Sequence, residues 1–360
     1  MTGKLNTQFE HGLRDMIMKT KTGKHPISKY LTGIFASLAL AVSAHAAEPI
    51  PLTMCAFTFM GEGGPEHQAL LDYQTAALSW GVKLTLKPYI NEKIVAEEMK
   101  SGVCDIANMT SIQARNFNKF TGTLDSPAAI PSYKHLQIVL ETLAKPSAAK
   151  YMRVGDYEVV GIQPAGEVFL FTNDRKLQSL SDMAGKRIAI LDSMPEMRQL
   201  VLDLGMTPVS STMTNMFQKF NNGATDITAG PAIVYELMEL HKGLLPNGGI
   251  LNMPLVQGNN QFVARWNKLP EGFGQKSRDY FIANFDKSLS IIRSAEDKIP
   301  KDLWVSLPES RKDEYDQQTR NIRLAFRDQN IYDAKMLTLL RKVRCQVDAT
   351  LAECTSATAE

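Results

Sequence analysis

The 360-residue sequence predicts an α/β fold of two facing lobes, because one order of strands, helices and turns occurs twice along the chain. Residues 185–230 are predicted to form strand, helix, strand, helix, strand, and residues 52–107 have the same order. The two stretches close on similar sequences, Gly102-Val103-Cys104-Asp105-Ile106 and Gly223-Ala224-Thr225-Asp226-Ile227. An α/β protein that merely reuses common turn residues is the alternative explanation of this repetition.

The first unit contains turn residues at the expected places. We expect its strands at residues 52–60, 82–86 and 103–107, separated by two helices. Pro65 suits the first turn of the first helix, and Asn91 is a suitable N-cap for the second. Gly61 to Gly64 form the turn between the first strand and the first helix.

The second unit is predicted in the same way. Its strands are expected at residues 187–191 and 208–211 and from residue 225 onward. Pro195 opens the first helix, whose apolar residues recur at helical spacing, and Thr214 is the expected N-cap of the second.

The segments around these units are expected to be mostly helical. Helices are predicted at residues 133–143, 148–156 and 231–241, and a long amphipathic helix at 273–299 spans the hinge. Strands are predicted at 159–163 and 168–173 around a Pro164-Ala165-Gly166 turn, and further strands at 250–255 and 262–264. The last sixty residues read as charged helices that pack on both lobes. The predicted domains are residues 1–46 (leader), 47–165 (first lobe), 166–250 (second lobe) and 251–360 (return strands and helices).

The leader has the pattern of a secretory signal peptide. A lysine-rich segment precedes an apolar run at residues 31–42, and Ala44-His45-Ala46 follows as a cleavage site. The run is too short to span a membrane comfortably. We therefore expect cleavage near Ala46 and Ala47 and a periplasmic mature protein. Met16 or Met18 would be a more ordinary start than Met1 for such a leader.

The predicted mature chain is close to electrically neutral. The whole sequence has a net charge of +2, and residues 1–46 contribute six basic and two acidic side chains. Residues 47–360 therefore carry a net charge of −2, so nothing in the charge indicates nucleic acid as a partner.

All four cysteines lie in the predicted mature chain, and an even number in an exported protein indicates disulfides. Cys55 and Cys104 become neighbours if the first three strands are ordered 2-1-3, and Cys345 and Cys354 would close a short loop. We predict these two pairs. Metal ligation is the alternative, but no Cys-x-x-Cys or Cys/His spacing supports a metal site.

Catalytic motifs and cofactor signatures do not stand out in the sequence. The predicted mature chain has three histidines and no nucleophile-elbow, zinc-protease or phosphate-loop pattern. We predict no catalytic residue, no cofactor and no metal. A hydrolytic enzyme on the same fold is a remaining alternative, with Asp192 and Glu62 as its acid–base pair.

Four stretches carry a family likeness. They are Phe171 to Lys176 leading into Leu180-Ser-Asp-Met-Ala-Gly-Lys-Arg-Ile, Leu204-Gly-Met-Thr-Pro-Val, Phe220-Asn-Asn-Gly-Ala-Thr-Asp-Ile, and Leu303-Trp-Val-Ser-Leu-Pro-Glu. In this order they resemble the periplasmic solute-binding proteins of tripartite ATP-independent (TRAP) transporters. The resemblance implies a two-lobed periplasmic-binding-protein-like fold that closes on a small molecule and delivers it to a membrane permease, as a monomer. Some divergent relatives are described as accessory proteins of drug efflux, which is an alternative function.

One position departs from the family's pattern. The family usually has an arginine where Ala189 stands here, and that arginine forks onto a substrate carboxylate. We expect this contact to be absent or to come from Arg187, Arg198 or Arg115. A pocket without it would favour a neutral or weakly polar solute.

The ligand is expected beyond the carboxyl ends of the strands, where open α/β sheets bind small molecules. The predicted ligand-binding residues are Phe59, Glu62, Gly63, Thr110, Arg187, Asp192, Ser193, Arg198, Gly230, Gln257 and Asn260. Two of these groups have purely structural alternatives, a tight turn at Gly61 to Gly64 and a hinge crossover at Gln257 to Gln261.

Overall fold

A computed structural model describes residues 48–355 of the chain, and the predicted leader lies outside these residues. The described strands are β1 (Ile50–Phe57), β2 (Val82–Tyr89), β3 (Ile106–Thr110), β4 (Arg153–Val154), β5 (Tyr157–Thr172), β6 (Arg187–Leu191), β7 (Thr207–Ser211), β8 (Ile227–Pro231), β9 (Gly249–Leu251), β10 (Val256–Arg265) and β11 (Trp304–Val305).

Helices surround these strands. The α-helices are α1 (Pro65–Ser79), α2 (Glu92–Ser101), α3 (Ser111–Ala114), α4 (Lys119–Gly122), α5 (Tyr133–Ala144), α6 (Ala149–Met152), α7 (Pro195–Asp203), α8 (Met216–Asn221), α9 (Ile233–Leu237), α10 (His241–Leu244), α11 (Phe273–Ala283), α12 (Phe285–Asp297), α13 (Glu309–Asp328), α14 (Ala334–Val347) and α15 (Ala352–Thr355). Short 3-10 turns include η1 (Gly61–Gly63) and η2 (Thr123–Asp125). None of the helices in this described part of the chain is both long and apolar enough to cross a membrane.

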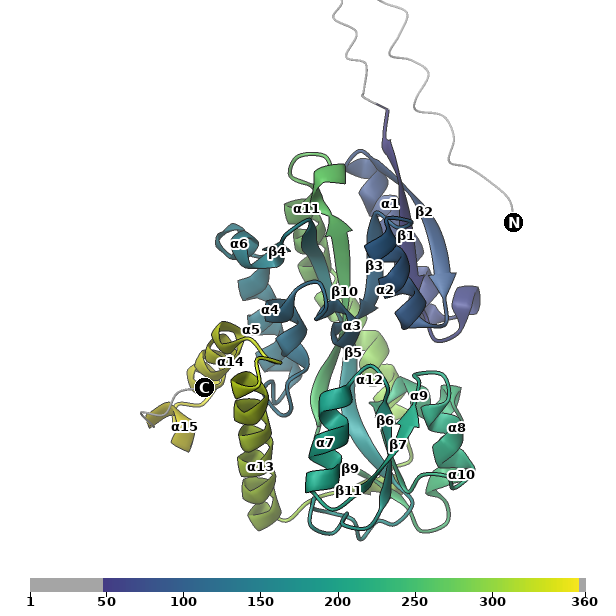
Figure 1. The fold of residues 1–360 in the computed structure, drawn as a ribbon, viewed down its shortest axis with the longest axis vertical. Coiled ribbons are helices and arrows are strands. Elements are labelled where there is room, and N and C mark those ends of the chain that lie inside the picture. The colour runs from purple at the N-terminus through teal and green to yellow at the C-terminus, as the bar shows by residue number, and fades with distance from the viewer. Residues whose placement is uncertain (1–47, 356–360) are drawn as a thin grey trace, which may run out of the picture. The chain divides into compact units, whose positions relative to one another are not determined.

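Two parallel sets of strands are joined by two long antiparallel strands. The strand order is β2-β1-β3-β10-β5-β8-β6-β7. Strands β1 to β3 are parallel, as are β6 to β8, whereas β10 and β5 run antiparallel to each other and to their outer neighbours. Figure 1 shows β5 and β10 between the two sets. The prediction of two βαβαβ units with order 2-1-3 is therefore confirmed.

Each parallel set is covered by helices on both faces. In β1, Met54 and Ala56 pack in a cluster with α1 and α11, while Cys55 and Phe57 pack in the cluster that includes α2 and α5. Successive side chains of a strand point to opposite faces, so an almost continuous apolar run fills both cores. The same alternation occurs in β6, where Ile188 and Ile190 face α7 and Ala189 lies in the cluster with α8.

The predicted Pro164-Ala165-Gly166 turn is wrong. Strand β5 runs through it for 16 residues, and the pairing with β10 shifts so that Gly258 opposes Gly166 and Asn259 opposes Pro164. Ala165 is thus the extra residue of a β-bulge. A bulge is one of the few places in a sheet where proline is tolerated, and Gly166 supplies a φ of 103°. The predicted boundary between residues 165 and 166 falls inside this strand, and the domain boundaries stay a prediction.

The long helix predicted over residues 273–299 is two helices that meet at Asn284. The Asn284 Nδ2 donates to the Tyr280 carbonyl at 2.8 Å, so its side chain competes with the helical backbone there. Helix α11 packs in the α1 cluster through Phe273 and Phe281. Helix α12 contributes Phe285 to the cluster with α5 and Ala295 to the cluster with α8. The pair therefore connects the cores on both sides of β5 and β10.

Three smaller expectations also change. Residues 148–156 form the short α6 and then a hairpin, because Gly155 has a φ of 56° and Val154 pairs with Tyr157 across a two-residue turn. Asn215 rather than Thr214 precedes α8. The helix predicted at 231–241 begins after β8 and divides into α9 and α10.

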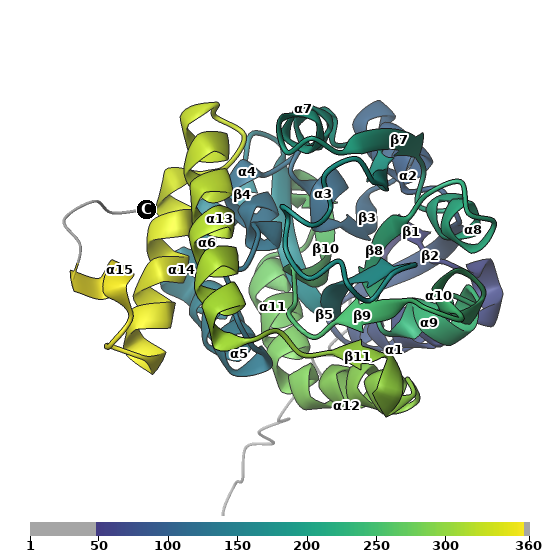
Figure 2. The ribbon, with the colours of Figure 1, turned by 90° about the horizontal axis from the view of Figure 1, so that it is seen from below.

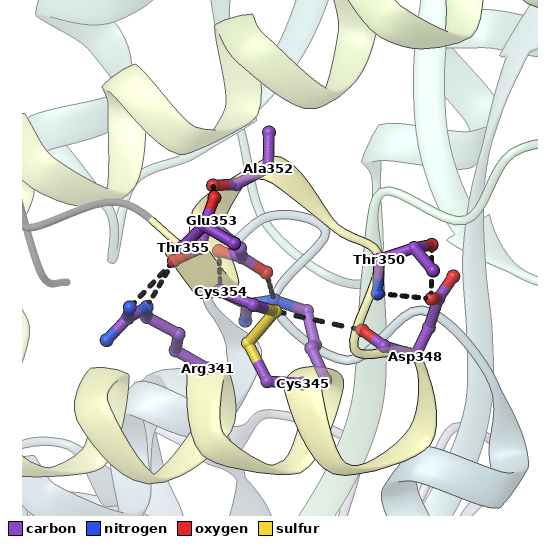
Figure 3. Close-up of a disulfide and its surroundings, with 9 residues drawn as sticks. Arg341, Cys345, Asp348, Thr350, Ala352, Glu353, Cys354 and Thr355 are labelled. Carbon is purple, nitrogen blue, oxygen red and sulfur yellow. Dashed lines mark hydrogen bonds and ion pairs between the residues drawn. A yellow bond between two sulfur atoms is a disulfide. The ribbon is translucent and has the colours of Figure 1, made fainter.

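Both predicted disulfides are present. Cys55 and Cys104 are bonded within the first unit, and Cys345 and Cys354 are bonded at the end of α14. Glu98 lies beside the first disulfide. Because Cys55 and Cys104 are bonded to each other, the carboxylate of Glu98 is the one group of this cluster that is free to bind a metal ion. Figure 3 shows the second pair holding α15 against α14, with Arg341 donating to the Glu353 carbonyl at 2.7 and 2.9 Å. Phe326, near the end of α13, packs with Tyr332 and with Leu337 of α14, and Figure 2 shows α13, α14 and α15 together on one side of the molecule.

Candidate ligand-binding cavity

A cavity of about 310 Å³ lies where the two parallel sets of strands end. Its lining includes Thr110 at the carboxyl end of β3, Leu191 at that of β6 and Gly230 near that of β8. The bulged part of β5 and its neighbour Asn260 on β10 complete the lining between the two sets. This position is the one that open α/β sheets use for ligands, and the volume suits a small molecule.

The wall from the second unit is apolar. Residues 188–191 of β6 all line the cavity, and so does Phe217 of α8. Six methionines add to this surface, namely Met183, Met194, Met197, Met206, Met213 and Met216. Methionine is flexible and polarisable, so such a wall adapts to the outline of an apolar ligand.

The wall from the first unit is polar. Glu66, at the start of α1, accepts a hydrogen bond from the Phe59 N–H at 2.9 Å, and burial raises the pKa of its carboxyl. The Thr110 hydroxyl donates to Glu92 Oε2 at 2.6 Å. Asn108 lines the same side, and its Oδ1 has no hydrogen-bond partner in the protein.

Arg115 approaches the cavity but its guanidinium is bound by two carboxylates. Its Nη2 lies 2.7 and 2.6 Å from the Asp125 oxygens, and its Nη1 lies 2.9 Å from Glu196 Oε1 on α7. The Tyr332 ring lies under the guanidinium at 5.0 Å. Gly122 makes room for this arrangement, because a Cβ there would lie 2.5 Å from the Arg115 Cα. Arg115 therefore joins the first unit to the second and has no fork left for a substrate carboxylate.

Lysine, arginine and histidine do not occur among the described residues that line the cavity. Ala189, at the position where the family resemblance implies an arginine, is buried and lines the cavity. An anionic ligand would therefore lose its hydration without gaining a cationic partner.

Four of the predicted ligand residues line this cavity. Phe59, Thr110, Gly230 and Asn260 come together from three strand ends and β10, and Asn260 lies opposite Thr110 in the sheet. At Gly230 a Cβ would lie 2.8 Å from Val234 and 2.9 Å from Phe217, so only glycine allows this close packing. Whether these residues bind a ligand stays a prediction.

Arg187 does not line the cavity. It is the exposed first residue of β6, whereas the four residues that follow it, Ile188 to Leu191, line the cavity. Arg187 pairs with Asp226 at 2.7 Å and holds the pKa of that carboxyl at about 2. The alternation of side chains along a strand predicts only which face Arg187 lies on. It does not predict where along the strand the cavity begins, so the prediction for this arginine was wrong.

The remaining predicted residues also lie outside the lining. Glu62 and Gly63 are exposed in η1, and Arg198 is exposed on α7. Asp192 and Ser193 are exposed in the turn after β6, where the Ser210 hydroxyl donates to Asp192. Gln257 is buried but donates to Glu167 Oε1 at 2.8 Å. Asp192 and Glu62, the pair considered for hydrolysis, therefore do not line the cavity.

The lining also includes groups that sequence reasoning missed. The six methionines all fall between residues 183 and 216, so their local enrichment was a usable signal. Glu66 had a weaker signal, as an acidic residue in the first turn of a helix that follows a strand. Nothing local in the sequence marks Asn108 or the partners of Arg115, because these contacts join segments that are far apart along the chain.

Comparison with known proteins gives a consistent result. The family model described as "Solute-binding protein AdeT 1/2" matches residues 68–359. The chain is 36% identical over 298 residues to "Probable solute-binding protein AdeT1" of Acinetobacter baumannii, covering 83% of this chain and 98% of that protein.

Solved structures show the same fold at low sequence identity. A TRAP periplasmic solute-binding protein of Ralstonia eutropha, with bound (S)-2-acetolactate, has a TM-score of 0.68 and 13% identity, covering 82% of this chain and 99% of that one. Another from Haemophilus influenzae, with bound L-gulonate, has a TM-score of 0.67 and 13% identity, covering 81% and 99%. The predicted two-lobed periplasmic-binding-protein-like fold and the TRAP resemblance are therefore confirmed.

Proposed function

The chain belongs to the AdeT 1/2 family of solute-binding proteins, and from this premise we propose that it captures a small molecule in the cavity between its two units and delivers it to a membrane permease. The observation that carries the proposal is the position of the cavity, which the strand ends of both units and the bulge of β5 enclose. A ligand in that place touches both lobes, so binding energy favours the closed arrangement.

Capture requires no covalent chemistry. Strands β5 and β10 and the helix pair α11 and α12 are the connections through which one lobe would move relative to the other. The ion pair between Arg115 and Glu196 would close across the same opening. The protein acts as a monomer in this proposal, and its partners are the ligand and the permease.

The test is native mass spectrometry of protein purified without unfolding. We expect a co-purified small molecule in the wild type and its loss in Ala229→Trp, which fills the cavity from β8. Ala224→Trp is the matched control, because Ala224 is exposed and does not line the cavity. Equal retention of the molecule by both variants would contradict binding in this cavity.

Export is part of the proposal and has its own measurement. N-terminal sequencing of the protein from the periplasm should start near Ala47 or Glu48. A mature chain that begins upstream of Leu31 would refute cleavage of the leader.

A further inference from the structure

The described lining of the cavity contains acidic side chains but no basic side chain that could pair with a bound anion. Glu66 and Asp125 are the two carboxylates in its described lining. Asp125 is paired with Arg115, but Arg115 also pairs with Glu196, so these three side chains together carry one net negative charge. The field inside the cavity therefore favours a positive charge.

Several hydroxyl groups of the lining donate their hydrogen bonds within the protein. Thr110 donates to Glu92. Burial raises the pKa of Asp125, and the ion pair with Arg115 and a hydrogen bond from Ser111 offset part of this rise. Further from this wall, the Tyr315 hydroxyl donates to the Pro254 carbonyl and the Thr319 hydroxyl donates to the Tyr315 carbonyl. These side chains therefore offer a ligand mainly their lone pairs.

One acceptor on this wall has no donor at all. Asn108 is 3% exposed, lines the cavity, and its Oδ1 has no hydrogen-bond partner. Asn108 lies opposite Ala56 of β1 in the sheet. Phe59, three residues after Ala56, donates its N–H to Glu66, so Asn108 and Glu66 belong to the same wall. A buried unpaired acceptor is unfavourable, so a ligand that donates a hydrogen bond here would be preferred.

We infer that the cavity takes an apolar cation, a molecule with one protonated amine and a hydrophobic body. The ammonium group would lie on the first-unit wall, near Glu66 and Asn108, and the body would lie against the methionines of the second unit. This inference rests on the proposed function and goes further than the neutral ligand predicted from the sequence. It uses the two carboxylates, the unpaired acceptor of Asn108 and the absence of lysine, arginine and histidine from the described lining.

Three probes with one chain length test the inference. Octylamine, 1-octanol and octanoate present a cation, a neutral hydroxyl and an anion on the same apolar body. Isothermal titration calorimetry at pH 7 should give octylamine an affinity at least about tenfold higher than 1-octanol, the gain of one charge-assisted hydrogen bond. Octanoate should bind more weakly than 1-octanol.

Variants test whether the preference for octylamine comes from the wall of the first unit. Glu66→Gln should remove most of the gain for octylamine and leave 1-octanol unchanged, because the amide keeps an oxygen for the Phe59 N–H. Glu62→Gln is the control, since Glu62 is exposed and outside the lining. Asn108→Leu, which removes the unpaired acceptor with little change in volume, is the second variant should Glu66→Gln fail to fold.

The outcomes separate the inference from the proposed function. The inference of a cationic ligand would be overturned if the protein bound octanoate or 1-octanol as tightly as octylamine. Either result would leave solute capture intact. No binding of any probe would also overturn the inference. If native mass spectrometry then showed no co-purified molecule, the proposed function would fail too.

Discussion

Replacing Arg115 by methionine should cost more stability than removing either one of its partners alone. The guanidinium is 12% exposed and lies between Asp125, 5% exposed, and Glu196, 12% exposed. Burial alone would lower the pKa of Arg115, but the negative charges of Asp125 and Glu196 raise it overall, so the side chain stays protonated. In the Arg115→Met variant the two carboxylates remain, largely buried and without a counter-ion.

The magnitudes follow from counting charges. Removal of one partner from a buried ion pair costs about 3–5 kcal/mol, because the remaining charge is uncompensated. Glu196→Gln removes one charge-assisted contact but leaves Arg115 balanced by Asp125, so we expect a loss of about 1–2 kcal/mol. Asp125→Asn should fall between the two, because Asp125 accepts two bonds at 2.6 and 2.7 Å.

Urea denaturation followed by tryptophan fluorescence measures these differences directly. Arg311→Met is a suitable control, because its ion pair with Glu314 is partly exposed and should contribute less than about 1 kcal/mol. A smaller loss for Arg115→Met than for Glu196→Gln would refute the charge count. Small-angle scattering of Glu196→Gln should also show a more open apo protein if Arg115 holds the lobes together.

Other predictions concern pH and covalent links. Burial raises the pKa of Glu92 to about 7 from 4.5, so its contribution, about 3 kcal/mol, is present below pH 4.5 and lost as pH rises through 7. Glu92→Gln mimics the protonated carboxyl, so its stability in urea should be close to that of the wild type at pH 4.5 and exceed it by pH 7.5, and a constant difference would contradict a raised pKa. Removing the Cys55–Cys104 link, which spans 49 residues, should cost about 4 kcal/mol, against about 2.5 kcal/mol for Cys345–Cys354, which spans 9. Equal losses in the paired serine variants would argue against loop closure as the cause.

The sequence predicted the repeated units because their signals are local. Pro195 begins α7, and the side chain of Asn91 accepts from the Lys93 N–H at the start of α2, as expected from capping preferences. The edges of buried strands were less certain, since apolar runs continue into the neighbouring turns. The bulge at Ala165 was missed because Pro-x-Gly is a turn signal unless a partner strand pairs on both sides, and that partner lies about a hundred residues further along.

The place of the cavity was predictable, but its lining was not. The rule that ligands lie beyond strand ends brought Phe59, Thr110, Gly230 and Asn260 to the cavity. It failed for Arg187, which is exposed at the start of β6 and pairs with Asp226. It could not reveal that Arg115 is bound by Asp125 and Glu196, since that depends on how α3, η2 and α7 pack.

We predict that a substitution at Ala189, which lines the cavity, changes the ligand class. Ala189→Arg would place a guanidinium in the apolar wall, where burial without a counter-ion should lower the melting temperature of the apo protein. A bound carboxylate would compensate it through a forked contact worth about 1.5–3 kcal/mol, so octanoate should bind ten- to a hundredfold more tightly than it does to Ala189→Met. The methionine variant is the matched control, because it adds a long side chain of the kind already present in this wall without a charge. Calorimetry with octanoate and octylamine measures both sides of the change. If Ala189→Arg folds and still binds octanoate no better than the methionine variant, the missing arginine is not what excludes carboxylates from this cavity.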